Sequence, residues 1–344
     1  MQSPRHTLEQ LLSGRDLTEV EAADLLRHLA SSALAPALAG ALLAALRGKG
    51  VTPAEVRGFA GAMRALARKP ALPPSPDAID IVGTGGDASG SLNLSTGAAL
   101  LSAACGLPVI KHGNRSISSR SGSADLLEQL GFRLPLDEHA AAECFAATGF
   151  TFLFAPYFHP AMKSLAPIRA ALGVRTVFNL LGPLTNPAAP RFYLIGAFDA
   201  AAAQLMAETL AGTDAGRAWV IHGAAGWDEA TPIGPFVAFD VERGKIQRRD
   251  LDPREFGLRR CTAADLAGGD AAANLGALRD VFEGRDRGAH RDALILQCGL
   301  ALYVAGRAAS IAAGIDLAGA VLDSGQAARW LTQLERFAAQ ARPS

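Results

Sequence analysis

The sequence predicts an α/β protein, with a small helical domain at the N-terminus and a larger α/β domain around a mostly parallel central sheet. Three observations support this fold class. Residues 7–69 show only helical periodicity, a proline-rich segment follows, and short apolar runs then alternate with longer helical runs. At 344 residues with 49% hydrophobic content, the chain can bury a large core divided between two domains.

Four helical segments are expected near the N-terminus, at 7–14, 17–31, 35–50 and 52–69. Thr18 and Thr52 are typical helix starts because each has a glutamate three residues further on. Gly48 and Gly50 are typical helix ends. Residues 69–78 contain four prolines and no periodicity, which indicates a linker. We therefore expect a helical domain at 1–70, a hinge at 71–78 and an α/β domain at 79–344.

Beyond the hinge, runs of strand length alternate with helical runs. Strands separated by helices predict right-handed crossovers and parallel pairing. A late apolar segment fits either a buried strand or a helix by periodicity, and its length and alanine content favour a helix. The expected strands are 78–83, 107–113, 192–198 and 218–223, and the expected helices are 95–106, 123–131, 201–212 and 291–306.

The loop after the first strand, "GTGGDASGSLNLSTG", has the composition of an anion site. Ligands of parallel α/β sheets bind beyond the carboxyl ends of the strands. Gly83, Gly85 and Gly86 carry no Cβ, so backbone N–H groups can approach an anion, and the hydroxyls of 93–96 begin the next helix. A plain glycine turn with a Ser/Thr cap fits this loop equally well, because it matches neither common phosphate-loop pattern.

A second strand-to-helix connection, "KHGNRSISSRSGSADLLEQLG" at 111–131, favours the anion site. It places Lys111, Arg115 and several hydroxyls where they can face the same pocket. Ser123 also fits an ordinary helix cap, a role compatible with ligand contact. His112 by itself is weak evidence for catalysis.

Two further clusters carry charge. Arg169 and Arg175 lie on an expected helix, and a guanidinium suits a ligand carboxylate, although Arg175 fits a structural ion pair equally well. Asp228 and Glu229 follow the strand at 218–223 and so lie at a carboxyl end of the sheet. Paired acids on a loop are usually only solvated, but beside bound phosphates they would hold magnesium.

These motifs together resemble the anthranilate phosphoribosyltransferase family of tryptophan biosynthesis. The resemblance runs through "GTGGD", "NLST", "KHGNR", "SGSAD", "HPAMK", "RTVFNLLGPLTNP", "DE" and "GGDAAANLGALRDVFEG", in order along nearly the whole chain. It implies a fold like that of class II nucleoside phosphorylases, in which the chain returns to the helical domain near 160–190. It also implies a homodimer formed through the small domains, and transfer of the phosphoribosyl group to anthranilate.

The resemblance assigns site residues by motif. Anthranilate would contact Gly83, Asn114 and Arg169, with Arg169 as the main partner of its carboxylate, and magnesium would be held by Ser95, Asp228 and Glu229. No general acid or base is assigned, because the aromatic amine is neutral at pH 7 and can attack directly once it is oriented. The sugar diphosphate would contact Gly83, Gly86, Asp87, Ser91, Asn93, Leu94, Ser95, Thr96, Lys111, His112, Gly113, Asn114, Arg115, Ser116, Ile117, Ser118, Ser119 and Ser123.

The loop "AAGWDEATPIGPF" departs from the family pattern. Ala225 stands where the family has an aspartate, and Trp227 adds bulk beside the acidic pair, while Leu92 replaces a common phenylalanine. One alternative is therefore a diverged transferase that uses another aromatic acceptor. Others are a nucleoside phosphorylase, against which the segment around Arg169 counts, and a non-catalytic relative that binds nucleic acid.

The charge balance disfavours that last alternative. Lys plus Arg equals Asp plus Glu at 33 each, so no overall field draws the chain to nucleic acid or to an anionic membrane. The N-terminus has no export-signal pattern, and the longest Ala/Leu-rich run is too short to span a bilayer, so we expect a cytoplasmic protein. The four scattered cysteines are expected to be buried thiols without a disulfide or zinc role.

Overall fold

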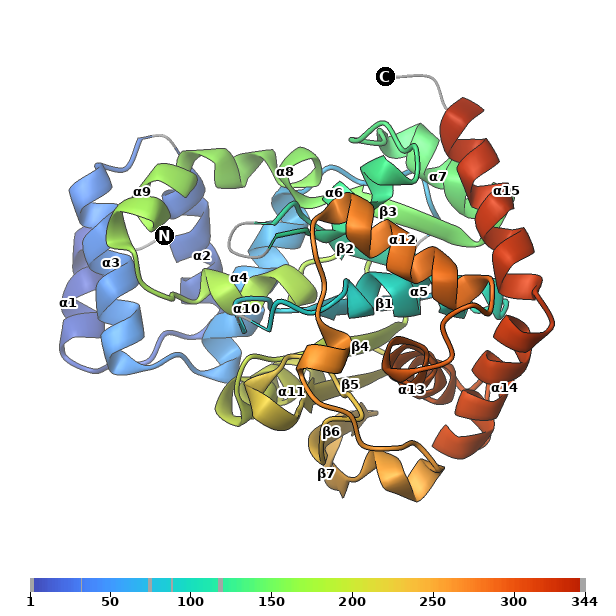
Figure 1. Ribbon diagram of the computed structural model, residues 1–344. Helices are drawn as coiled ribbons and strands as arrows, with labels where there is room; N and C mark the ends of the chain where they lie inside the picture. The colour runs from blue at the N-terminus through green and yellow to red at the C-terminus, as the bar shows by residue number, and fades with distance from the viewer. Residues whose placement is uncertain (1–2, 32, 74–75, 88, 117–119, 341–344) are drawn as a thin grey trace.

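The computed structural model describes residues 3–31, 33–73, 76–87, 89–116 and 120–340, and it begins with the expected helical bundle (Figure 1). Thr18 and Thr52 each cap a helix and accept the N–H of the glutamate three residues on, which confirms both predicted starts. Gly50, with φ of +89°, ends the third helix, whereas Gly48 lies inside it, so the prediction for Gly48 is wrong. The helices are α1 (Pro4–Leu12), α2 (Glu19–Ala30), α3 (Pro36–Lys49) and α4 (Pro53–Leu66).

A seven-stranded sheet in the order β3-β2-β1-β4-β5-β6-β7 forms the centre of the molecule. The first five strands pair in parallel, and β6 and β7 add an antiparallel edge, so the sheet is mostly parallel as predicted. The sequence patterns did not identify β3, β6 or β7. The strands are β1 (Ile79–Gly83), β2 (Val109–Gly113), β3 (Phe150–Phe154), β4 (Phe192–Gly196), β5 (Arg217–His222), β6 (Phe236–Glu242) and β7 (Lys245–Leu251).

One face of the sheet is covered by helices that follow β1 and by the C-terminal helices. α13 packs closely on α5 and α14, and these helices share an apolar core that includes Leu101, Phe282 and Leu294. The segment at 291–306 is therefore a helix, as its length favoured. The elements are α5 (Leu94–Ala104), α6 (Ser123–Gln129), α7 (Glu138–Thr148), α12 (Ala271–Phe282), α13 (Ala289–Val304), α14 (Ile311–Asp323) and α15 (Gln326–Gln340).

The other face is covered by α11 (Ala200–Ala211), which shares a second core with the N-terminal bundle. The chain returns to this bundle between β3 and β4, and Figure 1 shows α9 and α10 beside α1–α4. Phe178 packs edge-on against Phe59 of α4 with ring centroids 6.0 Å apart. The returning elements are α8 (Ala155–Phe158), η1 (Pro160–Ser164), α9 (Ala166–Leu172), α10 (Phe178–Leu181) and η2 (Gly182–Leu184).

The proline-rich segment runs between the two cores and is hydrogen-bonded near both ends. The N–H of Ala71 donates to the Glu138 carbonyl at 2.9 Å, and the Pro76 carbonyl accepts from the Arg191 N–H at 3.1 Å. Its role as a hinge stays a prediction. Across the described part of the chain, no helix combines the length and apolarity that a membrane span needs.

Candidate functional site

Two glycines end the strands at the point where the sheet order reverses. The chain runs from β1 to β2 and β3 on one side and later to β4 and β5 on the other, so β1 and β4 flank the crevice where such sheets bind ligands. A Cβ on Gly83 would collide with the carboxylate of Asp228, and a Cβ on Gly196 would collide with its carbonyl. The absence of a Cβ at these two positions therefore leaves room for Asp228. The sequence had suggested instead that Gly83 leaves room for a bound anion.

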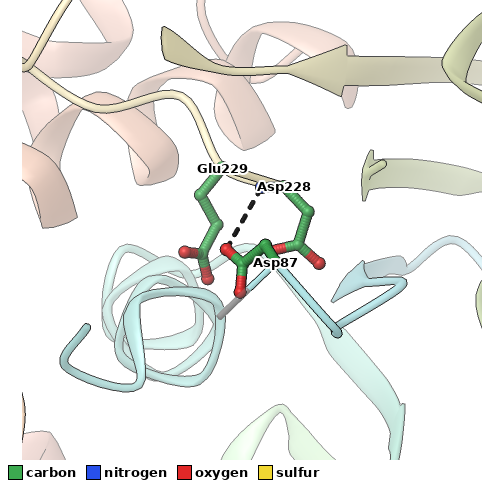
Figure 2. Close-up of side chains that lie close together, drawn as sticks. All are labelled: Asp87, Asp228 and Glu229. Carbon is green, nitrogen blue, oxygen red and sulfur yellow. Dashed lines mark hydrogen bonds between the residues drawn. The ribbon is translucent and has the colours of Figure 1, made fainter. Parts of the chain in front are cut away.

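Three carboxylates meet above these strand ends (Figure 2). Asp87, Asp228 and Glu229 each offer an oxygen, and the three oxygens lie within 4.8 Å of one another. The Asp228 N–H donates to Asp87 Oδ2 at 3.4 Å. The expected grouping of Asp228 with Glu229 is thus observed, and Asp87, which the sequence assigned to the diphosphate, joins them. We call these three residues the acidic cluster.

Among the described residues, no basic side chain forms an ion pair with the acidic cluster. Asp228 is 6% exposed and accepts one bond from the cluster's surroundings, from the Gly85 N–H at 2.6 Å. Burial, reinforced by the charge of Asp87, raises the pKa of Asp228 to about 7. Burial and the two aspartates raise the pKa of Glu229 well above its ordinary value. Such a cluster favours a cation or a proton.

Lys111 lies beneath the acidic cluster rather than in solvent. Its side chain is buried, and its ammonium donates to the Ile81 carbonyl at 2.5 Å and to Ser95 Oγ at 3.5 Å. Burial lowers the pKa of Lys111 to about 8, against the opposing effect of nearby carboxylates. The N–H of Ser95 donates to Glu229 at 3.2 Å. The predicted magnesium residues therefore lie together, with Lys111 as the nearest described cation.

The two predicted anion loops contact each other directly. Thr96 Oγ1 donates to Ser123 Oγ at 2.9 Å, and Asn93 Nδ2 donates to the Ser121 carbonyl at 3.0 Å. The structure contradicts the view of Ser123 as a helix cap. Gly122 occupies the cap position and its N–H donates to Asp125, so Ser123 is the first helical residue.

The rest of the second loop is tied to α6. Arg115 forms ion pairs with Asp125 and Glu128, and the Ser116 N–H donates to Asp125 at 3.0 Å. Asn114 is exposed and its carbonyl accepts the N–H of Ala124. Predicted site residues Ile117, Ser118 and Ser119 lie outside the described residues.

His112 extends to the opposite side of β2 from Lys111. Its Nδ1 lies 3.0 Å from the Gly182 carbonyl, and its ring packs edge-on against His159 with centroids 5.1 Å apart. Burial lowers the pKa of His112 to about 3 and that of His159 to about 4, so both rings are neutral at pH 7. The sequence pointed to His112 but gave no reason to pair it with His159.

Arg169 lies on α9 as predicted. Its guanidinium is 5.2 Å from the Phe178 ring centroid, and burial lowers its pKa. Among the described residues no carboxylate forms an ion pair with it. Arg175, by contrast, follows the helix end at Gly173, so its predicted helical position is wrong.

Arg175 contributes to the first loop through its guanidinium. It donates to the Gly86 carbonyl at 2.6 Å and stacks over the Phe198 ring at 4.0 Å. This contact joins the returning segment to the glycine loop. It is neither the ion pair nor the ligand contact that the sequence suggested.

Sequence reasoning missed Asn274, which connects the first of these loops to α12. Asn274 Nδ2 donates to Asn93 Oδ1 at 2.8 Å, and its own Oδ1 accepts the Gly269 N–H at 2.6 Å. The neighbouring Gly268 N–H donates to the Gly90 carbonyl at 2.8 Å. The motif "GGDAAAN" was visible in the sequence, but no spacing rule links it to a loop 180 residues earlier in the chain.

The altered loop around Trp227 leaves the crevice free of the indole. Trp227 is 4% exposed and belongs to the apolar core. Ala225 adopts φ of +60°, a left-handed conformation that alanine tolerates less well than aspartate or asparagine. The side chain of Trp227 therefore packs in the apolar core, so its bulk no longer argues for a different acceptor.

Comparison with known families agrees with this arrangement. Residues 5–67 match the model described as glycosyl transferase family, helical bundle domain, and residues 75–328 match the one described as glycosyl transferase family, a/b domain. Fold and site thus define a glycosyl transferase with a helical bundle and an α/β domain.

Individual relatives specify the family further. Anthranilate phosphoribosyltransferase of Rubrobacter xylanophilus is 45% identical over 97% of this chain and 96% of its own length. The crystal structure of the Thermus thermophilus enzyme has a TM-score of 0.89 at 43% identity, covering 96% of this chain and 99% of that one. The Saccharomyces cerevisiae enzyme in complex with PRPP and Mg has a TM-score of 0.88 at 25% identity, covering 98% of each chain. The chain belongs to the anthranilate phosphoribosyltransferase family.

Proposed function

We propose that this protein transfers the phosphoribosyl group of 5-phosphoribosyl 1-diphosphate to the amine of anthranilate, releasing diphosphate. The observation that carries the proposal is the acidic cluster beside two hydroxyl-rich loops that contact each other at the sheet's switch point. A cation site next to an anion site suits a substrate that reacts by losing diphosphate. As that bond breaks, positive charge develops on the sugar and negative charge on the leaving group.

Magnesium fits the residues present. Asp87, Asp228 and Glu229 supply the oxygen ligands that a hard cation prefers, and their mutual repulsion is relieved when a cation binds. Ser95 lies beside Glu229 and completes the predicted set. When bound, magnesium would offset the charge of the diphosphate. The backbone N–H groups and hydroxyls of 93–96 and of 113–123 would bind the remaining phosphate oxygens.

Anthranilate is proposed to lie towards the returning segment. Arg169 is available for its carboxylate, because no acidic side chain in the described chain pairs with it, and Asn114 and Gly83 would complete the contacts. The neutral amine needs orientation rather than a strong base. We therefore assign no general base, and burial makes the His112 and His159 rings weak bases by lowering their pKa values to about 3 and about 4.

The family resemblance also suggests a homodimer through the helical bundle. Exposed Leu12 on α1 and Val20 on α2 support this proposal, since they present apolar surface at 65% and 71% exposure. Light scattering at several concentrations tests it. A cytoplasmic location and closure about the segment at 71–78 remain predictions.

The transfer itself is tested with purified protein, both substrates and magnesium, by following the loss of anthranilate fluorescence. Arg169→Ala should raise KM for anthranilate and leave that for the sugar diphosphate nearly unchanged, because one charged hydrogen-bond partner is lost. The matched control is Arg68→Ala, since Arg68 also stacks on an aromatic ring but pairs with Glu138. Absence of turnover by the wild type, or a better acceptor among related aromatic acids, would contradict the proposal.

A further inference from the structure

Strand β1 is bonded to its two neighbours in different ways. With β4 it pairs over five positions, from Ile79 opposite Phe192 to Gly83 opposite Gly196. With β2 it pairs at one position only, Ile79 opposite Val109, although β2 pairs with β3 over its full length. The ladder between β1 and β2 therefore opens at the buried centre of the sheet. A backbone group left without a partner there would destabilise the fold.

The strand register identifies the backbone N–H and carbonyl groups that lose their ladder partners at the opening. A parallel ladder continuing from Ile79 and Val109 would contain a bond from the Ile81 N–H to the Ile110 carbonyl. The next bond would run from the His112 N–H to the Ile81 carbonyl. Two N–H groups and two carbonyls thus need other partners.

Three side chains supply partners for three of these four groups. The carboxylate of Asp80 accepts the His112 N–H at 3.2 Å. Asn186 Nδ2 donates to one carbonyl, that of Ile110, at 2.8 Å, and the Lys111 ammonium donates to the other at 2.5 Å. We call Asp80, Lys111 and Asn186 the wedge.

The wedge contacts the opening from both faces of the sheet. Side chains alternate along a strand, so Lys111 lies on the face of α5 and Asp80 on the face of the returning segment. Asn186 follows η2 on that second face and donates to Asp80 Oδ2 at 2.9 Å. Its own Oδ1 accepts the Ala188 N–H, so its orientation is fixed by bonds at both ends of the amide. All three wedge residues are buried.

We propose that Asp80 and Asn186 are positioning residues for the transfer reaction, because they hold β1 and β2 apart where the two anion loops begin. A closed ladder would bring the strands to about 4.8 Å. The His112 N–H would then compete with the Lys111 ammonium for the Ile81 carbonyl, the acceptor that holds Lys111 beneath Ser95. The spacing of the loops and the aim of Lys111 thus both depend on the wedge. The inference rests on the proposed function.

The test compares Asp80→Asn and Asn186→Ala with Asp240→Asn. Asp240 is also a buried aspartate, 7% exposed, but it pairs with Arg217 at the other end of the sheet. We expect the two wedge variants to lose about 10- to 100-fold in kcat, because small misplacement of reacting groups has costs of this size. Asp240→Asn should lose thermal stability while kcat stays unchanged.

A swapped variant separates positioning from general damage. Asp80→Asn turns one acceptor into a donor that opposes the Asn186 amide, and combining it with Asn186→Asp restores that pair. The double variant should recover part of the lost kcat, although the Ile110 carbonyl still lacks its donor. Hydrogen exchange at the His112 amide reports the state of the opening in each variant.

Unchanged kcat and KM in the wedge variants, whatever their stability, would overturn the inference. If Asp80→Asn fails to fold, Asn186→Ala alone decides, because it leaves the carboxylate in place. Calorimetry with magnesium and the sugar diphosphate provides the second readout. Weaker sugar binding than in Asp240→Asn supports the wedge even if anthranilate proves not to be the acceptor, and equal binding counts against it.

Discussion

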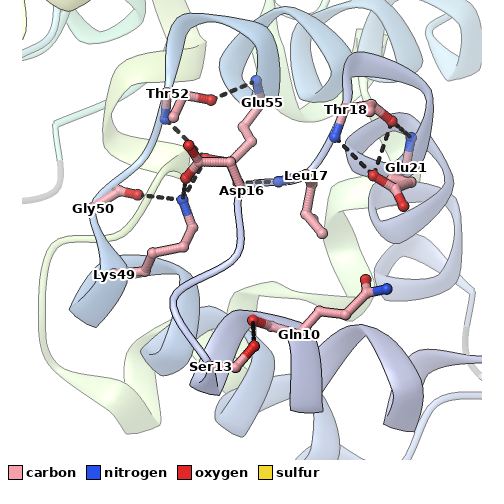
Figure 3. Close-up of polar contacts among 10 residues, drawn as sticks. All are labelled: Gln10, Ser13, Asp16, Leu17, Thr18, Glu21, Lys49, Gly50, Thr52 and Glu55. Atoms are coloured by element: carbon pink, nitrogen blue, oxygen red, sulfur yellow. Dashed lines mark hydrogen bonds and ion pairs between the residues drawn. The ribbon is translucent and has the colours of Figure 1, made fainter.

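Two buried carboxylates, one in the helical bundle and one in the site, are treated differently by the fold. Glu55 of α4 is fully buried and accepts from the N–H groups of Leu17 and Thr52 and from the ammonium of Lys49 (Figure 3). Asp228 accepts from the Gly85 N–H and otherwise faces other carboxylates. In the bundle, groups of the same chain pair with the buried carboxylate, whereas in the site the carboxylate charge is available to a ligand.

The comparison separates structural from functional burial of charge. Burying a carboxylate is expensive unless it is paired and hydrogen-bonded. Glu55 meets that condition with groups of the same chain, and its loss should therefore affect stability alone. Asp228 meets it only when a cation binds, and its loss should therefore affect function first. Five predictions test this distinction.

Glu55→Gln should have the largest effect on stability. Among the described residues, the change leaves Lys49, whose side chain is 5% exposed, with Asp16 as its remaining acidic partner. Breaking a buried pair from one side costs about 3–5 kcal/mol. Urea unfolding measures the loss. Activity per folded molecule should stay at the wild-type level, and a drop in kcat at full folding would contradict the distinction.

Asp228→Asn should lower kcat by about 10²- to 10³-fold, equivalent to about 3–4 kcal/mol at the transition state. The same change should leave the free energy of unfolding equal to or above that of the wild type without metal, because it removes repulsion with Asp87 and Glu229. Steady-state rates and urea unfolding are measured on one preparation. A destabilisation as large as that of Glu55→Gln would show that Asp228 is structural.

The pH dependence of metal-free stability sharpens the comparison. The pKa of Asp228 is raised in the folded state from 3.8 to about 7, so its protonation stabilises the fold at low pH. That contribution should be complete below pH 4 and lost as the pH rises through 7. Thermal unfolding from pH 4 to 8 should show this decline in the wild type, and the decline should be smaller in Asp228→Asn.

The stabilisation by magnesium should increase with pH over the range in which the metal-free protein loses stability. Its ligands must lose their protons, so added Mg²⁺ should stabilise the wild type increasingly as the pH approaches 7 and above. At 100 times Kd the gain is about 2.7 kcal/mol. An equal gain in Asp228→Asn would place the cation elsewhere.

Thr18→Ala should have the smallest effect. It removes the hydroxyl that accepts the Glu21 N–H at the start of α2. Loss of such a cap costs about 1 kcal/mol. Urea unfolding should detect the change, and turnover should be unaffected because the cap lies in the bundle. A change in KM for either substrate would reveal coupling between the bundle and the site.

Short sequence patterns correctly predicted the features that depend on residues close together in the chain. Thr18 and Thr52 began helices as expected because a cap and its glutamate partner are three residues apart. The central strands β1, β2, β4 and β5 were found from apolar runs. The edge strand β7 was missed, since most of its residues are exposed and polar and its pairing depends on β6.

The sequence by itself determined the helices of the N-terminal bundle, the four central strands and the residue types that gather at the strand ends. Only the tertiary structure decided that Asp87 joins Asp228 and Glu229, that Trp227 turns into the core, and that Asp80 and Asn186 fill an opened ladder. The physical reason is the separation along the chain over which the stabilising interactions act. A helix cap or an amphipathic helix is stabilised by residues a few positions away in the sequence. The free energy of burying a charge depends instead on the distant segments that the fold places around it.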